Sequence, residues 1–333
     1  MSTPLGRRLV ALIPLAVFAV PYVYGAQRTF VSTAGNDGNS CALSSPCRGF
    51  AKALTVTDSG GEIVVLDSGG YGAVAIGQPV SITAPPGVYA GISVFAGGAT
   101  SGQGVVINAG TGNVVLRGLT INNLGGTNGI AFNSGDALYL DSVVVSGFAG
   151  GVGLIASVGA ATSGLFIQDS IFRDNAAGLK TATAGGTLTL NIERATFVRN
   201  GKGADMQGTT KGVIHASTFG GGTTGLAAGL AGSPLAVKLE LRNCTVSDNS
   251  GVGISAIASS PTMLAVVSSL VSGNLVGVQV ANPGNVAYVS DSTITRNGTG
   301  VQASAGGIVA SGGDNRLVNN TTNGAVSSTI PKL

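Results

Sequence analysis

The sequence predicts an all-β fold, a right-handed parallel solenoid that begins with a short capping helix. One pattern recurs nine times along the 333 residues, with steps of 22 to 27 residues between successive starts. A period of this length is typical of a solenoid. The ordered pieces are short and rich in Val, Ile, Thr and Phe, as strands are. The nine starts are Leu116, Leu140, Ile167, Ile192, Ile214, Leu241, Val266, Val289 and Gly312.

Each repeat places residues of one kind at the same distance from its start. The residue five places after the start is apolar in all nine repeats, so this column is expected to face the interior and to stack Phe172, Phe197 and Phe219. The residue eight places after the start is usually Asn. We expect these asparagines to form a hydrogen-bonded ladder with left-handed backbone, and the Gly that follows to supply a second left-handed bend. The ladder would contain Asn175, Asn200, Asn249, Asn274, Asn297 and Asn320. The coils are expected to be right-handed, because right-handed crossover is the norm for parallel strands.

The chain before the repeats divides into two expected parts. Residues 1–25 are typical of a signal peptide, because Arg7 and Arg8 precede an apolar run that ends at Val20. Residues 26–59 are an entrance segment, and helical spacing over residues 47–57 predicts the capping helix. The solenoid is expected over residues 60–324, followed by a C-terminal tail over residues 325–333.

Cysteine usage favours an oxidising compartment. Cys41 and Cys47 enclose a short loop and are expected to form a disulfide. A metal pair is the alternative, but the only histidine, His215, lies far away in the sequence. Cys244 occupies the small-residue position of its repeat and is expected to be a buried thiol. We therefore expect a secreted or periplasmic protein with no metal ion and no cofactor.

Composition excludes some partners. The net charge is +3, and without the two arginines of the predicted signal peptide 15 basic residues face 14 acidic ones. Such a balance provides no electrostatic footprint for nucleic acid. No stretch is long and apolar enough to predict stable membrane insertion. A polysaccharide or cell-surface glycan is the expected partner, and the residues give no indication of the oligomeric state.

The repeats and the entrance segment together resemble the right-handed parallel β-helix proteins of the pectin-lyase-like superfamily, in particular secreted bacterial members without a characterised function. The stretches Thr29–Asp37, Cys41–Cys47 and Gly60–Tyr71 are similar to the entrance of that group. The resemblance covers about residues 28–324. It implies the fold strongly and the chemistry weakly, because the superfamily includes lyases, hydrolases, esterases, epimerases and noncatalytic surface proteins.

One exposed row carries the candidate chemistry. Glu193, His215 and Arg242 fall on consecutive repeats and are the candidate catalytic residues, close enough to transfer a proton or to hold an anionic sugar. The alternative is a charge-balanced strand face without catalysis. Two further carboxylate pairs, Asp141 with Glu193 and Asp291 with Asp314, are weaker candidates. The whole row is Arg117, Asp141, Gln168, Glu193, His215 and Arg242.

These residues leave two function classes open. The signatures of the enzymatic β-helix families are missing, and the chain has no Trp and only 6 Tyr for a sugar cleft. A noncatalytic surface, matrix or glycan-interaction scaffold is therefore the preferred function. A polysaccharide lyase, hydrolase or epimerase is the alternative.

Overall fold

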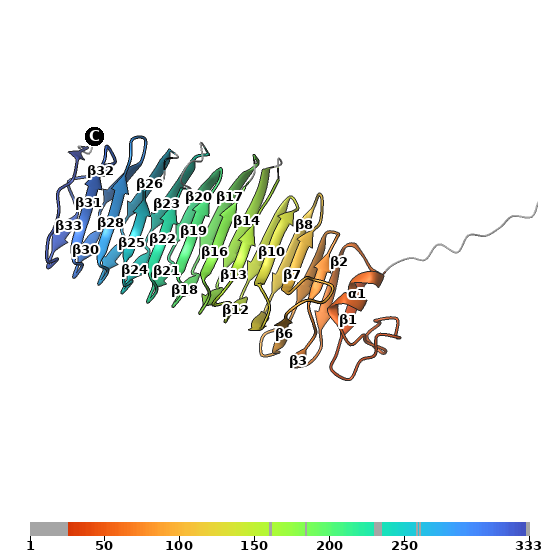
Figure 1. Ribbon diagram of the computed structural model, residues 1–333. Coiled ribbons are helices and arrows are strands. Elements are labelled where there is room, and N and C mark those ends of the chain that lie inside the picture. Colours follow the sequence, from red (N-terminus) through yellow and green to blue (C-terminus); the bar gives the residue numbers. More distant parts are fainter. Residues whose placement is uncertain are drawn as a thin grey trace, which may run out of the picture.

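A computed structural model describes residues 26–159, 162–183, 185–229, 235–257, 259 and 261–330. The predicted signal peptide, residues 1–25, lies outside the described residues. The chain winds into an elongated solenoid in which each complete coil adds one strand to each of three sheets (Figure 1). Neighbouring strands of these sheets are parallel, as the repeat predicts.

Sheet 1 is the longest. Its thirteen strands are, in spatial order, β1 (Ala26–Val31), β2 (Thr57–Val65), β5 (Val80–Thr83), β8 (Asn113–Arg117), β11 (Ala137–Asp141), β14 (Thr162–Gln168), β17 (Thr187–Glu193), β20 (Thr210–His215), β23 (Val237–Arg242), β26 (Thr262–Val267), β29 (Val286–Ser290), β32 (Ile308–Ser311) and β34 (Ser328–Thr329). The expected limits of the solenoid are thus extended at both ends, because β1 comes from the entrance segment and β34 from the C-terminal tail.

Sheets 2 and 3 follow sheet 1 in each coil. Sheet 2 has eleven strands, β3 (Gly69–Gly70), β6 (Ala90–Phe95), β9 (Leu119–Leu124), β12 (Val144–Ser146), β15 (Ile171–Arg173), β18 (Thr196–Val198), β21 (Thr218–Gly220), β24 (Thr245–Ser247), β27 (Leu270–Ser272), β30 (Thr293–Thr295) and β33 (Arg316–Val318). Sheet 3 has ten strands, β4 (Val74–Ile76), β7 (Gln103–Asn108), β10 (Asn128–Ser134), β13 (Val152–Ala156), β16 (Ala177–Ala182), β19 (Lys202–Gln207), β22 (Thr224–Ala228), β25 (Val252–Ala256), β28 (Val276–Ala281) and β31 (Thr299–Ser304).

The predicted register is confirmed for eight of the nine starts. Sheet 1 pairs Leu116 with Leu140 and continues in step to Val289. The ninth start is wrong by one residue, because Val289 pairs with Ser311 and not with Gly312. The register recovers in sheet 2, where Ile294 pairs with Leu317.

The inner aromatic column is confirmed. Phe172, Phe197 and Phe219 are fully buried in adjacent coils. The ring centroids of the first two are 5.0 Å apart, and those of the second two are 4.8 Å apart with nearly parallel planes. They belong to one continuous apolar core that runs the length of the solenoid.

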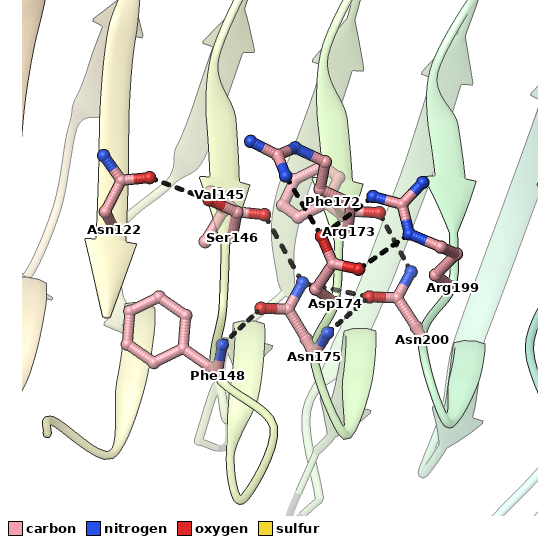
Figure 2. Close-up of polar contacts among 10 residues, drawn as sticks. All are labelled: Asn122, Val145, Ser146, Phe148, Phe172, Arg173, Asp174, Asn175, Arg199 and Asn200. Carbon is pink, nitrogen blue, oxygen red and sulfur yellow. Dashed lines mark hydrogen bonds and ion pairs between the residues drawn. The ribbon is translucent and has the colours of Figure 1, made fainter. Parts of the chain in front are cut away.

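The asparagine ladder also forms (Figure 2). Asn175 donates from its side-chain amide to Oδ1 of Asn200 at 3.0 Å, and Asn249 donates in the same way to Asn274 at 2.8 Å. Each of these acceptor oxygens also receives the backbone N–H of the donor residue. The amides are thereby paired although they are buried, which avoids the cost of unsatisfied polar groups.

Two backbone predictions at the bends are wrong. The left-handed residue at the ladder corner is not the Asn but the residue before it, for example Asp174 with φ 61° and Arg199 with φ 52°. The Gly that follows the Asn does not have positive φ either. The second left-handed bend lies instead between sheets 1 and 2, two places after the start, as at Ala216 with φ 49°.

The regular recurrence of those glycines along the repeats has a packing cause. A Cβ added to Gly178 would lie 2.7 Å from the carbonyl oxygen of Gly203 and 2.9 Å from the Phe197 ring. The same conflict recurs up the stack, so the glycines form a column that lets sheet 3 pass close to the ring column. Its members are Gly104, Gly129, Gly153, Gly178, Gly203, Gly225, Gly253, Gly277 and Gly300.

The entrance segment packs at the β1 end of the solenoid (Figure 1). It contains a seven-residue helix, α1 (Phe50–Val56), which buries Phe50 and Ala53. The predicted disulfide joins Cys41 and Cys47. Tyr71 donates a hydrogen bond to the Asp67 carboxylate, which also accepts from the Ser32 hydroxyl at 2.6 Å. Among the described residues, no helix has the length and apolar character that a membrane crossing requires.

Candidate functional site

The outer face of sheet 1 carries the candidate site. Side chains alternate across a strand, so the residues on either side of each buried start point outward. The residue before the start is Tyr139 on β11, Phe166 on β14 and Asn191 on β17. The residue after it is Asp141, Gln168 and Glu193 on the same three strands. Two columns of outward side chains therefore run side by side along the solenoid axis.

Tyr139 and Phe166 form a stacked pair on this surface. Their ring centroids are 4.6 Å apart and their planes differ by 7°. Small residues at the preceding outward position, Ala137 and Gly164, leave room for the rings. An added Cβ at Gly164 would come within 2.6 Å of the Phe166 ring, so a larger residue there would displace it.

A hollow of about 390 Å³ lies over this pair. It is open to solvent and combines the apolar ring faces with charged and amide groups. Its lining is Val115, Arg117, Tyr139, Leu140, Asp141, Phe166, Ile167, Gln168, Asn191 and Glu193. An aromatic surface surrounded by a few polar groups is the usual composition of a small-molecule or sugar site.

Arginines engage both carboxylates of the hollow. Arg117 binds Asp141 with 2.9 Å between Nε and Oδ2. Glu193 pairs with Arg194, which reaches back with two further hydrogen bonds to Asp169, at 2.7 and 2.9 Å. The hydrogen bonds from Arg194 lower the pKa of Asp169. The site is thus close to electrically neutral, with its carboxylate oxygens available as hydrogen-bond acceptors.

The three candidate catalytic residues lie on consecutive coils, as the register predicts. Glu193 pairs with His215 in the ladder, and His215 pairs with Arg242. Within the described part of the chain, however, no hydrogen bond or ion pair joins the three side chains. Nε2 of His215 lies 3.1 Å from the side-chain amide nitrogen of Asn243. Arg242 binds Glu240 on its own strand.

The other carboxylate pairs have structural partners. Asp291 accepts from Ser268 at 2.8 Å, and Asp314 accepts from Ser290 at 2.9 Å and from the backbone N–H of Asp291. Each carboxylate therefore fastens one coil to the preceding one. Asp141 and Glu193 are two strands apart, roughly 9 to 10 Å at the usual strand spacing, which is the upper limit for an inverting pair of glycosidase carboxylates.

Comparison with known proteins agrees with the fold. The family model described as "Right handed beta helix region" matches residues 103–276 and, in an overlapping match, residues 158–322. The two matches together span most of the chain. The protein belongs to this right-handed β-helix family. The handedness expected from the parallel crossovers is thus that of the family, and the pectin-lyase-like resemblance is confirmed for the fold.

Solved structures show the same architecture. The structure titled "Crystal structure of pectate lyase Pel9A" is similar over 92% of this chain and 79% of that chain, with a TM-score of 0.58 and 17% identity. A rhamnogalacturonan lyase is similar over 81% of this chain and 76% of that chain, with a TM-score of 0.39 and 13% identity, and supports no conclusion. No curated protein matches the sequence. At an identity this low, the structural similarity establishes the β-helix fold and not an activity.

The stacked ring pair was missed from the sequence. We expected the scarcity of aromatic residues to argue against a sugar-binding site lined by aromatic side chains. Two rings on adjacent coils are nevertheless enough to form a platform on which a sugar ring can stack. A signal was present, because Tyr139 and Phe166 both stand one place before a repeat start and must therefore point outward. Their contact also needs the small residues beside them, which the repeat does not reveal.

Potential metal ligands are dispersed in the described part of this β-helix. Among the residues that the structure describes, no group of three or more His, Cys, Asp and Glu could hold a metal ion. Cys41 and Cys47 are bonded to each other. Cys244 is buried, and burial raises the pKa of its thiol.

Proposed function

We propose that this β-helix is a secreted, noncatalytic scaffold that binds polysaccharide in the hollow over Tyr139 and Phe166. The stacked and solvent-facing ring pair is the observation that carries the proposal. A pyranose ring has an apolar face of C–H groups that packs on an aromatic ring, and its hydroxyl groups need hydrogen-bond partners when they leave water. The hollow offers both kinds of contact.

The polar groups around the rings fit recognition of hydroxyl groups. Asp141 and Glu193 are acceptors, Arg117 is a donor, and the amides of Gln168 and Asn191 are both. Because arginines hold the two carboxylates in place, the acceptors are oriented before a ligand arrives. Binding without cleavage does not require a side chain that gives a proton to the polysaccharide or takes one from it.

A polysaccharide-cleaving enzyme is the second candidate. Two observations favour it: the similarity of the fold to a pectate lyase structure, and the spacing of Asp141 and Glu193 across the hollow. In this alternative, one carboxyl group would act as the acid and the other as the base on opposite sides of the glycosidic bond.

One experiment separates binding from cleavage. The protein is incubated with a panel of uronate and neutral polysaccharides, and both retention on the polymer and release of reducing ends are measured. We expect binding without depolymerisation. The Tyr139→Ala/Phe166→Ala double variant should lose about tenfold or more in affinity, which corresponds to about 1.4 kcal/mol. Tyr89→Ala, which removes an exposed ring outside the hollow, is the matched control.

The outcomes are distinct. Equal affinity for the wild type and the double variant would contradict the proposed site. Depolymerisation that disappears in Asp141→Asn or Glu193→Gln, with binding retained, would establish the enzyme instead.

Two further features of the proposal concern the N-terminal end. Export through the predicted signal peptide would place the protein in an oxidising compartment, with which the Cys41–Cys47 disulfide is compatible. We also propose that α1 covers the open edge of the first coil, because an uncovered edge strand invites pairing with another chain. The burial of Phe50 and Ala53 supports this role.

A further inference from the structure

A second hollow lies farther along the same outer face. It has a volume of about 470 Å³ and extends from β17 to β29. Val213, Met263 and Tyr288 give it apolar walls, and Met263 is 54% exposed. Lys211 and Lys238 line it as well, and both are exposed.

The two lysines are aligned on adjacent strands. Lys211 on β20 pairs directly with Lys238 on β23 in the parallel ladder. Neighbouring strands lie roughly 4.8 Å apart, and like charges placed directly opposite each other destabilise a sheet. This pair therefore has an electrostatic cost that the fold itself does not require.

The hollow also contains one carboxylate, that of Glu240, but no acidic side chain in the described residues forms an ion pair with either lysine. Elsewhere on the outer face, arginines bind carboxylates, as in the pairs Glu62 with Arg28, Asp141 with Arg117 and Glu193 with Arg194. Glu240, which stands two residues after Lys238, is bound by Arg242. Among the residues described, neither lysine makes an ion pair or a hydrogen bond. The second hollow is thus a local concentration of uncompensated positive charge beside an apolar wall.

We propose that Lys211 and Lys238 form a subsite for an anionic group, a carboxylate or a sulfate, on the same polysaccharide that stacks on Tyr139 and Phe166. This inference rests on the proposed function and names the class of its ligand as an acidic polysaccharide. The anion neutralises both lysines at once and removes their repulsion. The apolar wall strengthens the attraction, because charges interact more strongly where less water surrounds them.

The positions of the two sites set the size of the ligand. From Phe166 on β14 to Lys211 on β20 the ladder crosses two strand intervals, roughly 9 to 10 Å, and from Tyr139 on β11 to Lys238 on β23 it crosses four, roughly 19 Å. A single sugar ring does not reach both sites. A chain that runs along the solenoid axis does, so affinity rises steeply with chain length once both sites are occupied.

The test compares charged and neutral polymers on matched variants. Polygalacturonate carries carboxylates, dextran sulfate carries sulfates, and dextran is the neutral counterpart of the latter. Affinity for each is measured at low and high salt for the wild type, Lys211→Gln/Lys238→Gln and Lys211→Arg/Lys238→Arg. The control is Lys52→Gln/Lys180→Gln, which removes the same charge from α1 and from sheet 3.

We expect the glutamine double variant to bind at least one of the two acidic polymers tenfold or more weakly. The arginine variant and the control should stay within about twofold of the wild type, and salt should weaken the wild type far more than the glutamine variant. Loss for polygalacturonate alone assigns a carboxylate, and loss for dextran sulfate alone assigns a sulfate.

Two results would overturn the inference. Unchanged binding of acidic polymers in the glutamine variant, with binding lost in Tyr139→Ala/Phe166→Ala, would remove the lysine subsite and leave the proposed function standing. Failure of the wild type to bind any polymer would contradict both the lysine subsite and the proposed function.

Discussion

The ring of Tyr139 stacks on the ring of Phe166 across two adjacent coils, with 4.6 Å between the ring centroids. Inside the same solenoid Phe197 stacks on Phe219 at 4.8 Å. The two stacks have almost the same geometry but opposite surroundings, since one is sealed in the core and the other faces solvent. A core stack stabilises the fold, whereas a surface stack of this size leaves apolar area available for a ligand.

The inner stack should dominate stability. Replacing Phe197 by Ala removes a buried ring and should lower the free energy of unfolding by about 3 to 5 kcal/mol. Phe166→Ala, which truncates a partly exposed ring, should cost less than about 1 kcal/mol. Denaturant melts of the two variants test the difference, and similar losses would show that the two rings do not differ in burial.

The glycine column should reject even one methyl group. Gly178→Ala places a Cβ 2.7 Å from the carbonyl oxygen of Gly203, and overpacking of this kind costs about 1 to 3 kcal/mol. Gly77→Ala is the control, because its added Cβ would meet nothing within 4 Å. If thermal melts of the two variants coincide, close packing is not the reason for the column.

The left-handed bend between sheets 1 and 2 should accept glycine. Ala216 has φ 49°, a conformation that costs a residue with a Cβ about 1 to 2 kcal/mol. Because glycine loses more freedom on folding, Ala216→Gly should stabilise by a net amount of about 0.5 to 1 kcal/mol. Ala149→Gly, at an exposed residue without positive φ, should not stabilise. A lower denaturation midpoint for Ala216→Gly would contradict the assigned bend.

Acid should weaken the entrance segment. Burial opposes ionisation of Asp67, but hydrogen bonds from Ser32, Tyr71 and Thr33 outweigh it and lower its pKa from 3.8 to about 2. A carboxyl group whose pKa falls on folding stabilises the folded state above its unfolded pKa. That contribution should be complete above about pH 4 and should disappear as the pH falls toward 2.

Asp67→Asn tests this dependence. The variant should be less stable at pH 7 and should lose less stability than the wild type between pH 4 and 2 in denaturant titrations. Asp58→Asn is the control, because the Asp58 side chain makes no hydrogen bond among the described residues. Parallel curves for Asp67→Asn and the wild type would exclude Asp67 as the source.

The sequence predicts the coils well because each coil repeats the same contacts. Apolar residues five places after each start had to face the interior, and this column, with the asparagine ladder, fixed the register through eight starts. The ninth start failed because an extra residue enters the chain between Ser311 and Leu317, where the pattern is weakest.

Backbone geometry and surface packing were harder to predict. A Gly in a repeat is compatible with either positive φ or a lack of space, and only the contacts around Gly178 distinguish the two. The Tyr139 and Phe166 platform depends on the small residue Gly164, and the lysine subsite depends on which carboxylates the arginines engage. Each of these relationships depends on which particular side chains meet on the folded surface, and the repeat pattern does not specify them.

A crystal structure of the protein with an oligosaccharide chosen from the binding panel tests the central claim most directly. The account predicts a sugar ring packed on the faces of Tyr139 and Phe166, with hydroxyl groups hydrogen-bonded to Asp141, Glu193 or Gln168 and the chain continuing along sheet 1 toward Lys211. Density for the sugar on sheet 2 or sheet 3, with the ring pair left bare, would contradict it.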